Sequence, residues 1–363
     1  MISFIKNEFV LFLGMITVIV FKLGGNDVLA SDIGSLLGIM ASIAIFVVVM
    51  AAIFAVVRHS DALAIKLGDP YGTLILTLAV ISLEVVMISS VMITGESNPV
   101  LARDTMFAVV MTVMNGLVGI TLLIGGVKYH TQKYNVDGLQ SYLVAIIPLS
   151  LLCLVLPSFT SSNDVGAMSA SLTWTLVLAS IGLYSVFLFI QTKSHTKYFM
   201  DEDHQDEHEF HGPLGSNLYH SLLLVGYLLV VILLAKSLAI PINGTVDMWG
   251  APPALGGLIV AFLILAPEAV GAAKAALNNQ LQRAMNLFFG SVLATIALTV
   301  PAVLMISHVI NEPVHLGLEP PEMILLCMTL LMAGVSFNRG RTNSLNGATH
   351  LILFIAYVIL MFD

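Results

Sequence analysis

The feature that most constrains this chain is a series of apolar runs, of 18 or more residues, that recurs along its length. A run of that length with few charges can cross the apolar core of a bilayer as one helix. Only 10% of the residues are charged and 58% are hydrophobic, too few charges to cover a soluble globule of this size. The short alternating segments of a β-barrel are not seen. The sequence therefore predicts an all-α polytopic membrane protein.

The apolar runs between polar breaks predict about eleven transmembrane helices. The first run is the weakest, because its apolar core extends only from Phe9 to Phe21. We expect it to be retained as a helix, and a signal peptide cleaved near Ala30 is the alternative. The runs fall near residues 8–22, 33–57, 69–94, 104–127, 139–157, 169–191, 217–240, 253–277, 284–310, 321–337 and 345–362.

The basic residues divide unevenly between alternate connections of these helices. Three of the 14 lie on one side, at Lys22, Arg103 and Lys236, and the remaining eleven lie on the other. Lysine and arginine concentrate in cytoplasmic connections, so the richer side is predicted to be cytoplasmic. We therefore expect a protein of the cell's inner (plasma) membrane, with a cytoplasmic N-terminus and a periplasmic or extracellular C-terminus. The eleven are Lys6, Arg58, Lys66, Lys128, Lys133, Lys193, Lys197, Lys274, Arg283, Arg339 and Arg341.

The third and eighth runs carry the same pattern in opposite orientations. Gly72 stands twelve residues before Glu84, and Gly256 stands twelve residues before Glu268. Five helices in each copy make the two copies face opposite ways, and inverted repeats of this kind are typical of secondary transporters. The sequence predicts four parts: a first helix with its connection (1–32), a five-helix repeat (33–191), a cytoplasmic acidic and histidine-rich loop (192–216) and a second five-helix repeat (217–363).

Glu84 and Glu268 are the leading candidate site residues, because each lies deep in an apolar run. A charged side chain at that depth costs at least a few kcal/mol, so such residues are rare and usually functional. A buried carboxyl group tends to hold a proton when no cation is near, and a cation displaces that proton. Two such groups can therefore exchange cations for protons. The alternative is a pair of protonated carboxyl groups that join helices by hydrogen bonds.

Polar side chains on the following helices are candidate additional cation ligands. Asn115 and Ser291 are the stronger candidates, and Thr295 and Ser82 are weaker ones. Hydrogen bonds between helices are the alternative role for all of them. His350 is expected near a helix end rather than on a proton path.

The only long polar stretch lies between the sixth and seventh predicted helices. Its histidines are spaced three and four residues apart, so a helix would place them on one side. One interpretation is a solvated linker between the two repeats. The other is a low-affinity element that attracts or senses cations and regulates transport. The regulatory candidates are Asp201, Glu202, Asp203, His204, Asp206, Glu207, His208 and Glu209.

The segments GDPYGTLILTLAVISLEVVM (68–87) and LAPEAVGAAKAALNNQLQRAMNLFFGSVLA (265–294) resemble the calcium/proton exchangers of the calcium/cation antiporter superfamily, in particular bacterial calcium/proton antiporters. The resemblance covers essentially the whole chain and implies one extra helix, two inverted five-helix repeats and an acidic linker. It implies that Glu84 and Glu268 are the two repeat glutamates, and that Asn115 and Ser291 are the polar positions of the second helices. The acidic stretch corresponds to residues 201–209.

Three positions depart from the pattern of that superfamily. Ile81 and Leu265 stand where eukaryotic members have asparagine, and Ala269 stands where histidine is frequent. Fewer side-chain oxygens are then available to a cation. The leading prediction is export of Ca²⁺ in exchange for H⁺, and a Na⁺ or K⁺/proton antiporter of the same architecture is the alternative.

Other classes of protein fit the sequence less well. An intramembrane enzyme needs a nucleophile with its base, or paired metal-binding histidines in the spans, and neither is visible. The net charge of −8 argues against nucleic acid as a partner. The predicted partners are the lipid bilayer, inorganic cations and protons, with no cofactor, and the sequence does not set an oligomeric state.

Overall fold

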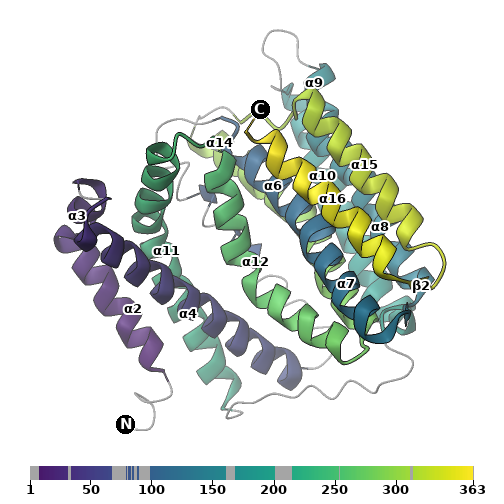
Figure 1. Cartoon of the computed structure of the whole chain (residues 1–363), viewed down its shortest axis with the longest axis horizontal. Coiled ribbons are helices and arrows are strands. Elements are labelled where there is room, and N and C mark those ends of the chain that lie inside the picture. The colour runs from purple at the N-terminus through teal and green to yellow at the C-terminus, as the bar shows by residue number, and fades with distance from the viewer. Residues whose placement is uncertain are drawn as a thin grey trace. The chain divides into compact units, whose positions relative to one another are not determined.

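The computed structural model describes residues 8–31, 34–67, 99–160, 168–200, 215–252, 254–310 and 314–362, and single helical positions at 79, 81, 82, 84, 85, 88 and 89. Its regular structure is almost entirely helical (Figure 1). Most of the predicted third span, the segment 68–78 and the acidic residues 201–209 lie outside the described residues.

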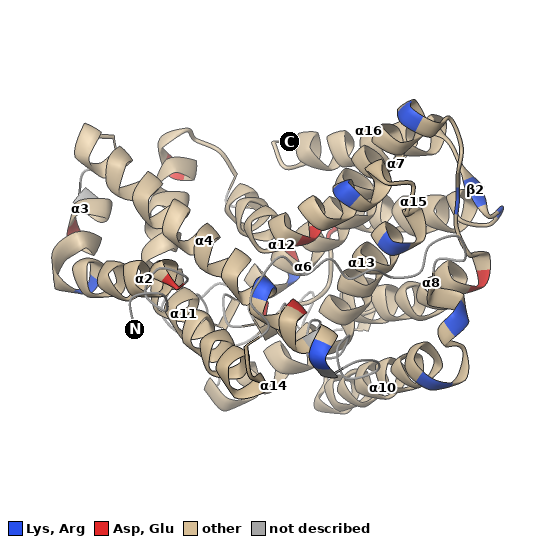
Figure 2. Cartoon of the chain, turned by 90° about the horizontal axis from the view of Figure 1, so that it is seen from below, with Lys and Arg blue, Asp and Glu red and all other residues tan. Residues whose placement is uncertain are grey.

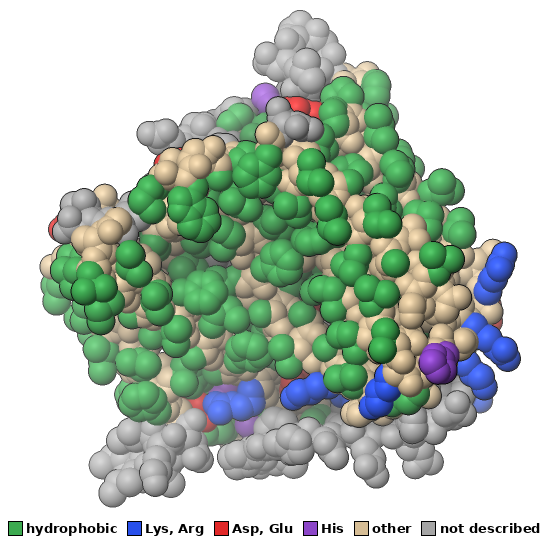
Figure 3. Space-filling view, in the orientation of Figure 1, with side chains coloured by type: hydrophobic (Ala, Val, Ile, Leu, Met, Phe, Trp, Pro, Cys, Tyr) green, Lys and Arg blue, Asp and Glu red, His purple; other side chains and the backbone are tan. Residues whose placement is uncertain are grey.

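Eight stretches in the described part of the chain are long and apolar enough to cross a membrane. Two shorter apolar helices, α15 (Pro320–Ser336) and α16 (Ser344–Leu360), follow them. Hydrophobic side chains cover most of the visible surface (Figure 3), and Lys and Arg lie mainly near helix ends (Figure 2). The predicted all-helical membrane class is therefore confirmed. The eight are Phe9–Ala30, Leu36–Leu63, Leu101–Tyr129, Val136–Val155, Ala170–Ser194, Asn217–Met248, Ala254–Leu277 and Leu281–Ile310.

The chain forms two compact units, and each takes helices from both halves of the sequence. Unit 1 comprises residues Met1–Glu96 and His208–Ile259. In it α4 packs along α11, and α2 packs against both. A Cβ atom on Gly14 of α2 would lie 2.5 Å from a methyl group of Val230, so α2 and α11 approach closely there. Its helices are α2 (Phe9–Val20), η1 (Phe21–Gly25), α3 (Asn26–Ser31), α4 (Leu36–Leu67), α11 (Asn217–Met248) and the first turns of α12 (Ala254–Leu277).

Unit 2 comprises residues Ser97–Glu207 and Val260–Asp363. Here α16 packs along α7 and η2, and α13 packs against α8. A Cβ atom on Gly347 of α16 would lie 2.8 Å from the carbonyl oxygen of Gly119, so glycine allows this close approach. Besides most of α12, α15 and α16, its helices are α6 (Leu101–Met111), η2 (Thr112–Leu117), α7 (Val118–Tyr129), α8 (Val136–Ser150), η3 (Leu151–Val155), α9 (Pro157–Thr160), α10 (Ala170–Phe189), η4 (Ile190–Ser194), η5 (Thr196–Phe199), α13 (Leu281–Ala294), η6 (Thr295–Thr299) and α14 (Val300–Ile310).

Two long helices of unit 2 contain a π-helical segment at corresponding places in the two predicted repeats. Segment η2 interrupts the helix from Leu101 to Tyr129, and η6 interrupts the helix from Leu281 to Ile310. Asn115 lies in η2, and Thr295, another candidate ligand, begins η6. Single π turns inside α-helices are often found at functional sites, because they change which side chains face inward.

Connections predicted on the same side of the membrane contact each other in unit 2. Strand β1 (Gln132–Lys133) pairs antiparallel with β2 (Arg341–Thr342). Both strands belong to connections on the side that is richer in lysine and arginine. On the other side, the backbone N–H of His315 donates to the carbonyl of Pro99. Which side faces the cytoplasm stays a prediction, as does the division of the chain into two repeats.

Candidate cation site

Glu84 lies on the buried face of a helical stretch in unit 1. Its own exposed fraction is 2%, and Ile81 and Ile88 are 6% and 2% exposed. Residues three before and four after a helical position share its face. Glu84 therefore lies on a buried helix face between two apolar side chains, and a carboxylate withdrawn from water to this extent is costly unless a proton, a cation or a hydrogen-bond donor compensates its charge.

Glu268 occupies a corresponding position in α12, within unit 2. It is half-buried, and Leu265 and Ala272, three before and four after it, are buried. Pro267 precedes it inside the helix. Because proline has no N–H, the carbonyl of Leu263 lacks its usual helical donor.

Asn115 is fully buried in η2 and joins three segments of unit 2. Its Nδ2 donates to Oγ1 of Thr329 at 2.7 Å, and its Oδ1 lies 3.1 Å from Nδ1 of His350. The second ring nitrogen of His350 lies 3.2 Å from Oγ of Ser336. These are hydrogen bonds between helices, the role that the sequence left open as the alternative. A role of Asn115 as a cation ligand stays a prediction.

His350 departs from the sequence-based expectation. It is the seventh residue of α16, and its exposed fraction is 0%. The expectation that it sits near a helix end is therefore wrong. A single histidine in an apolar run carries no sign of its partners, and only packing against η2 and α15 identified them.

The other predicted ligands belong to different helices. Ser291 is half-buried in α13, and Thr295 is buried at the start of η6. Ser82 is half-buried on the stretch that carries Glu84. Glu84 and Ser82 belong to unit 1 and the remaining candidates to unit 2. Within the described residues, no three His, Cys, Asp or Glu side chains form a group that could hold a metal ion.

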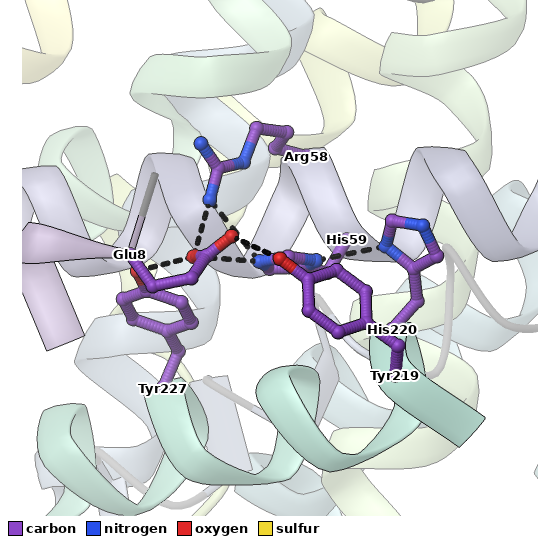
Figure 4. A network of polar contacts seen from close by, with 6 residues as sticks. All are labelled: Glu8, Arg58, His59, Tyr219, His220 and Tyr227. Carbon is purple, nitrogen blue, oxygen red and sulfur yellow. Dashed lines mark hydrogen bonds and ion pairs between the residues drawn. The ribbon is translucent and has the colours of Figure 1, made fainter. Parts of the chain in front are cut away.

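A second polar cluster, centred on Glu8, was not predicted from the sequence. Glu8 precedes α2, and its side chain is almost fully buried in unit 1. Arg58 of α4 pairs with its Oε2 at 2.7 Å. Two tyrosines of α11 donate to the same carboxylate, Tyr219 at 2.8 Å and Tyr227 at 2.9 Å (Figure 4). Glu8 thus links α2 to both long helices of unit 1.

Charge and hydrogen bonding keep Glu8 ionised. Burial by itself raises the pKa of its carboxyl group, but the hydrogen bonds from Tyr219 and Tyr227 and the charge of Arg58 outweigh burial, and the pKa lies below its ordinary value.

Two histidines extend the Glu8 cluster. Nε2 of His59 lies 3.3 Å from Glu8, and its Nδ1 lies 2.9 Å from Nδ1 of His220 (Figure 4). One of these two Nδ1 atoms must carry the hydrogen and the other must accept it. A signal for the cluster was present in the sequence, because Glu8, Arg58-His59 and Tyr219-His220 all stand at ends of apolar runs on the side predicted to be cytoplasmic.

Sequence comparison identifies relatives along nearly the whole chain. The sodium/calcium exchanger protein family matches residues 35–193 and 219–362. The sodium-potassium/proton antiporter ChaA of Escherichia coli (strain K12) is 42% identical over 366 residues, covering 98% of this chain and 96% of that protein. The Ca²⁺/H⁺ antiporter ChaA of Bacillus subtilis (strain 168) is 24% identical, covering 94% of this chain and 97% of that protein.

Solved structures share the fold. The structure of native YfkE matches with a TM-score of 0.72 at 19% identity, covering 97% of this chain and 99% of that chain. The H⁺/Ca²⁺ exchanger CAX matches with a TM-score of 0.69 at 14% identity, covering 98% of this chain and 88% of that chain. Helix α2 and Glu8 lie outside the two segments that the family matches. The chain therefore belongs to the sodium/calcium exchanger protein family, within the calcium/cation antiporter superfamily, and is a membrane transporter rather than an enzyme.

Proposed function

We propose that the protein is a cation/proton antiporter that exchanges Na⁺ or K⁺ for H⁺, with Glu84 and Glu268 binding the cation and protons in turn. The 42% identity to the sodium-potassium/proton antiporter of Escherichia coli, over 98% of this chain, supports monovalent cations. This proposal puts the alternative from the sequence ahead of its leading prediction, calcium.

The observation that carries the proposal is the matched setting of the two glutamates. Each has buried apolar residues three before and four after it, so each carboxyl group is on the inward face of its helix. In such surroundings the charged form is disfavoured unless a cation is bound. Proton and cation binding then exclude each other, and that exclusion couples the two fluxes.

The residues beside the glutamates also favour a monovalent cation. Ile81 and Leu265 share the buried faces of Glu84 and Glu268, at the positions where the resemblance leads one to expect asparagine. Calcium takes six to eight oxygen ligands. Two apolar side chains in place of two amides remove oxygens from those faces, and this loss matters more for Ca²⁺ than for Na⁺ or K⁺.

Calcium/proton exchange is the second candidate. Two carboxylates match the charge of one Ca²⁺ ion, and the relative from Bacillus subtilis, 24% identical, is a Ca²⁺/H⁺ antiporter. Asn115 and Ser291 would be further ligands in either case. The predicted acidic loop, residues 201–209, would raise the local cation concentration near its side of the membrane and so regulate transport.

The test is cation-driven proton movement in proteoliposomes that contain a pH-sensitive dye. Na⁺, K⁺ and Ca²⁺ are added in turn to the wild type and to Glu84→Gln, Glu268→Gln and a matched control, Asp247→Asn, which neutralises an exposed carboxylate near the end of α11. We expect Na⁺ or K⁺ to drive proton flux in the wild type and the control, and neither glutamine variant to respond, because an amide cannot exchange a proton.

Two outcomes would contradict the proposal. Near-normal flux in either glutamine variant would remove that carboxyl group from the mechanism. Proton flux driven by Ca²⁺ alone would favour the second candidate.

A further inference from the structure

A chain of hydrogen bonds through Asn115 has a defined direction. Thr329 donates from Oγ1 to the carbonyl of Leu325 at 2.8 Å, so its only hydrogen is already used. The same oxygen therefore acts as an acceptor towards Asn115, whose Nδ2 lies 2.7 Å away. This contact identifies which end of the Asn115 amide is nitrogen.

The other end of the amide then determines the state of His350. Oδ1 of Asn115 can only accept, so the hydrogen between it and Nδ1 of His350 belongs to the ring. In a neutral ring Nε2 is then the acceptor, and it receives the hydroxyl hydrogen of Ser336. Asn115, His350 and Thr329 have an exposed fraction of 0%, and that of Ser336 is 3%, so no bulk water replaces these contacts.

The orientation of Asn115 depends on both partners. An amide side chain has two nearly equivalent orientations, related by a half-turn, that exchange its oxygen and nitrogen. The acceptor at Thr329 selects the orientation found here, and Nδ1–H of His350 adds a hydrogen bond that the amide accepts only in this orientation. The amide oxygen has two lone pairs, and accepting from His350 uses only one of them. The second lone pair can bind a cation.

We propose that His350 is a positioning residue for transport, which holds the Asn115 amide with its oxygen available to the transported cation. The proposal rests on the proposed function, in which Asn115 is a cation ligand. His350 lies 235 residues from Asn115 in the sequence and belongs to the last described helix.

The test compares the wild type with His350→Leu, His350→Asn and Ser336→Ala in proteoliposomes. For each, the half-saturating concentration of Na⁺ or K⁺ and the maximal proton flux are measured. Leucine removes both ring nitrogens. Asparagine keeps an N–H donor near the place of Nδ1, and Ser336→Ala removes only the contact on the far side of the ring. We expect the leucine variant to raise the half-saturating concentration about tenfold, the effect of one lost buried hydrogen bond. The other two variants should stay within about twofold of the wild type.

The same substitutions in an Asn115→Ala background show whether His350 acts through Asn115. Adding His350→Leu to Asn115→Ala should then cause no further loss of affinity, because interacting residues are not additive. If the wild type exchanges cations for protons, two results would overturn the proposal. One is an equal loss of cation affinity on adding His350→Leu to the wild type and to Asn115→Ala. The other is a His350→Asn variant as impaired as His350→Leu. A wild type without any cation-driven flux would instead overturn the proposed function, and the positioning role with it.

A measurement independent of transport is nitrogen NMR of histidine-labelled protein, in which His350 is assigned by its absence from the His350→Asn spectrum. We expect the neutral ring to carry its hydrogen on Nδ1, the less common tautomer in solution. A hydrogen on Nε2 would contradict the direction of the hydrogen-bond chain and overturn the proposal.

Discussion

At the scale of single residues, Glu8 shows how one carboxylate can hold α2, the helix that precedes the two segments matched by the family, against its neighbours. It accepts from Tyr219 and Tyr227 and pairs with Arg58, and these partners belong to α4 and α11. Replacing Glu8 with Gln removes the negative charge and weakens each contact. We expect a loss of roughly 1–2 kcal/mol of stability at neutral pH, measured as a lower apparent Tm in detergent.

The pH dependence of this loss has a definite sign. Because the pKa of Glu8 is lowered in the folded protein, the ionised form stabilises the fold above the ordinary carboxyl pKa, and this contribution disappears as the pH falls through the folded pKa. The difference between the wild type and Glu8→Gln should therefore be full at pH 7 and shrink as the pH falls below about 4.5. The exposed Asp247→Asn variant serves as the control and should show little difference at either pH. A difference that stays constant with pH would contradict the role of the charge.

At the scale of helices, the contact between α7 and α16 depends on small residues. A Cβ atom on Gly347 would lie 2.7 Å from the backbone nitrogen of Leu123 and 2.8 Å from the carbonyl oxygen of Gly119. Backbone atoms cannot move aside as a flexible side chain can, so Gly347→Ala should push the helices apart and cost about 1–3 kcal/mol. Apparent Tm and the fraction that stays monodisperse on heating measure this cost.

Gly334 of α15 is the matched control for Gly347, because a Cβ atom there meets nothing within 4 Å. Gly334→Ala should be neutral or slightly stabilising, since alanine favours helix and narrows the unfolded ensemble. Equal destabilisation by the two substitutions would show that helix contact is not the cause.

At the scale of the whole molecule, the uneven distribution of basic residues predicts orientation in the membrane. Eleven of 14 lysines and arginines fall on alternate connections that should be cytoplasmic. A reporter fused after Asp363 should read as periplasmic or extracellular, and one inserted near Gln205 as cytoplasmic. Both reporters on one side would mean that the number of predicted spans is wrong.

The sequence alone determined the class of the protein, predicted where its membrane helices lie, and made Glu84 and Glu268 the leading candidate site residues. Run length and apolar composition are local properties, so they predict membrane helices without knowledge of what packs where. The high cost of burying charge made Glu84 and Glu268 conspicuous in their runs. The matched spacing of glycine and glutamate further indicated an inverted repeat.

Only the tertiary structure decided which polar side chains meet. Asn115 contacts His350 across 235 positions, and Glu8 contacts Tyr219 across 211. Asn115 and His350 stand out in the sequence as single polar residues in apolar runs, but none of these four residues has a local pattern that names its partner. The π turn that carries Asn115 is likewise seen only in the tertiary structure. Partners of this kind are selected by helix packing, because a buried polar group must find a donor or acceptor among the segments that surround it.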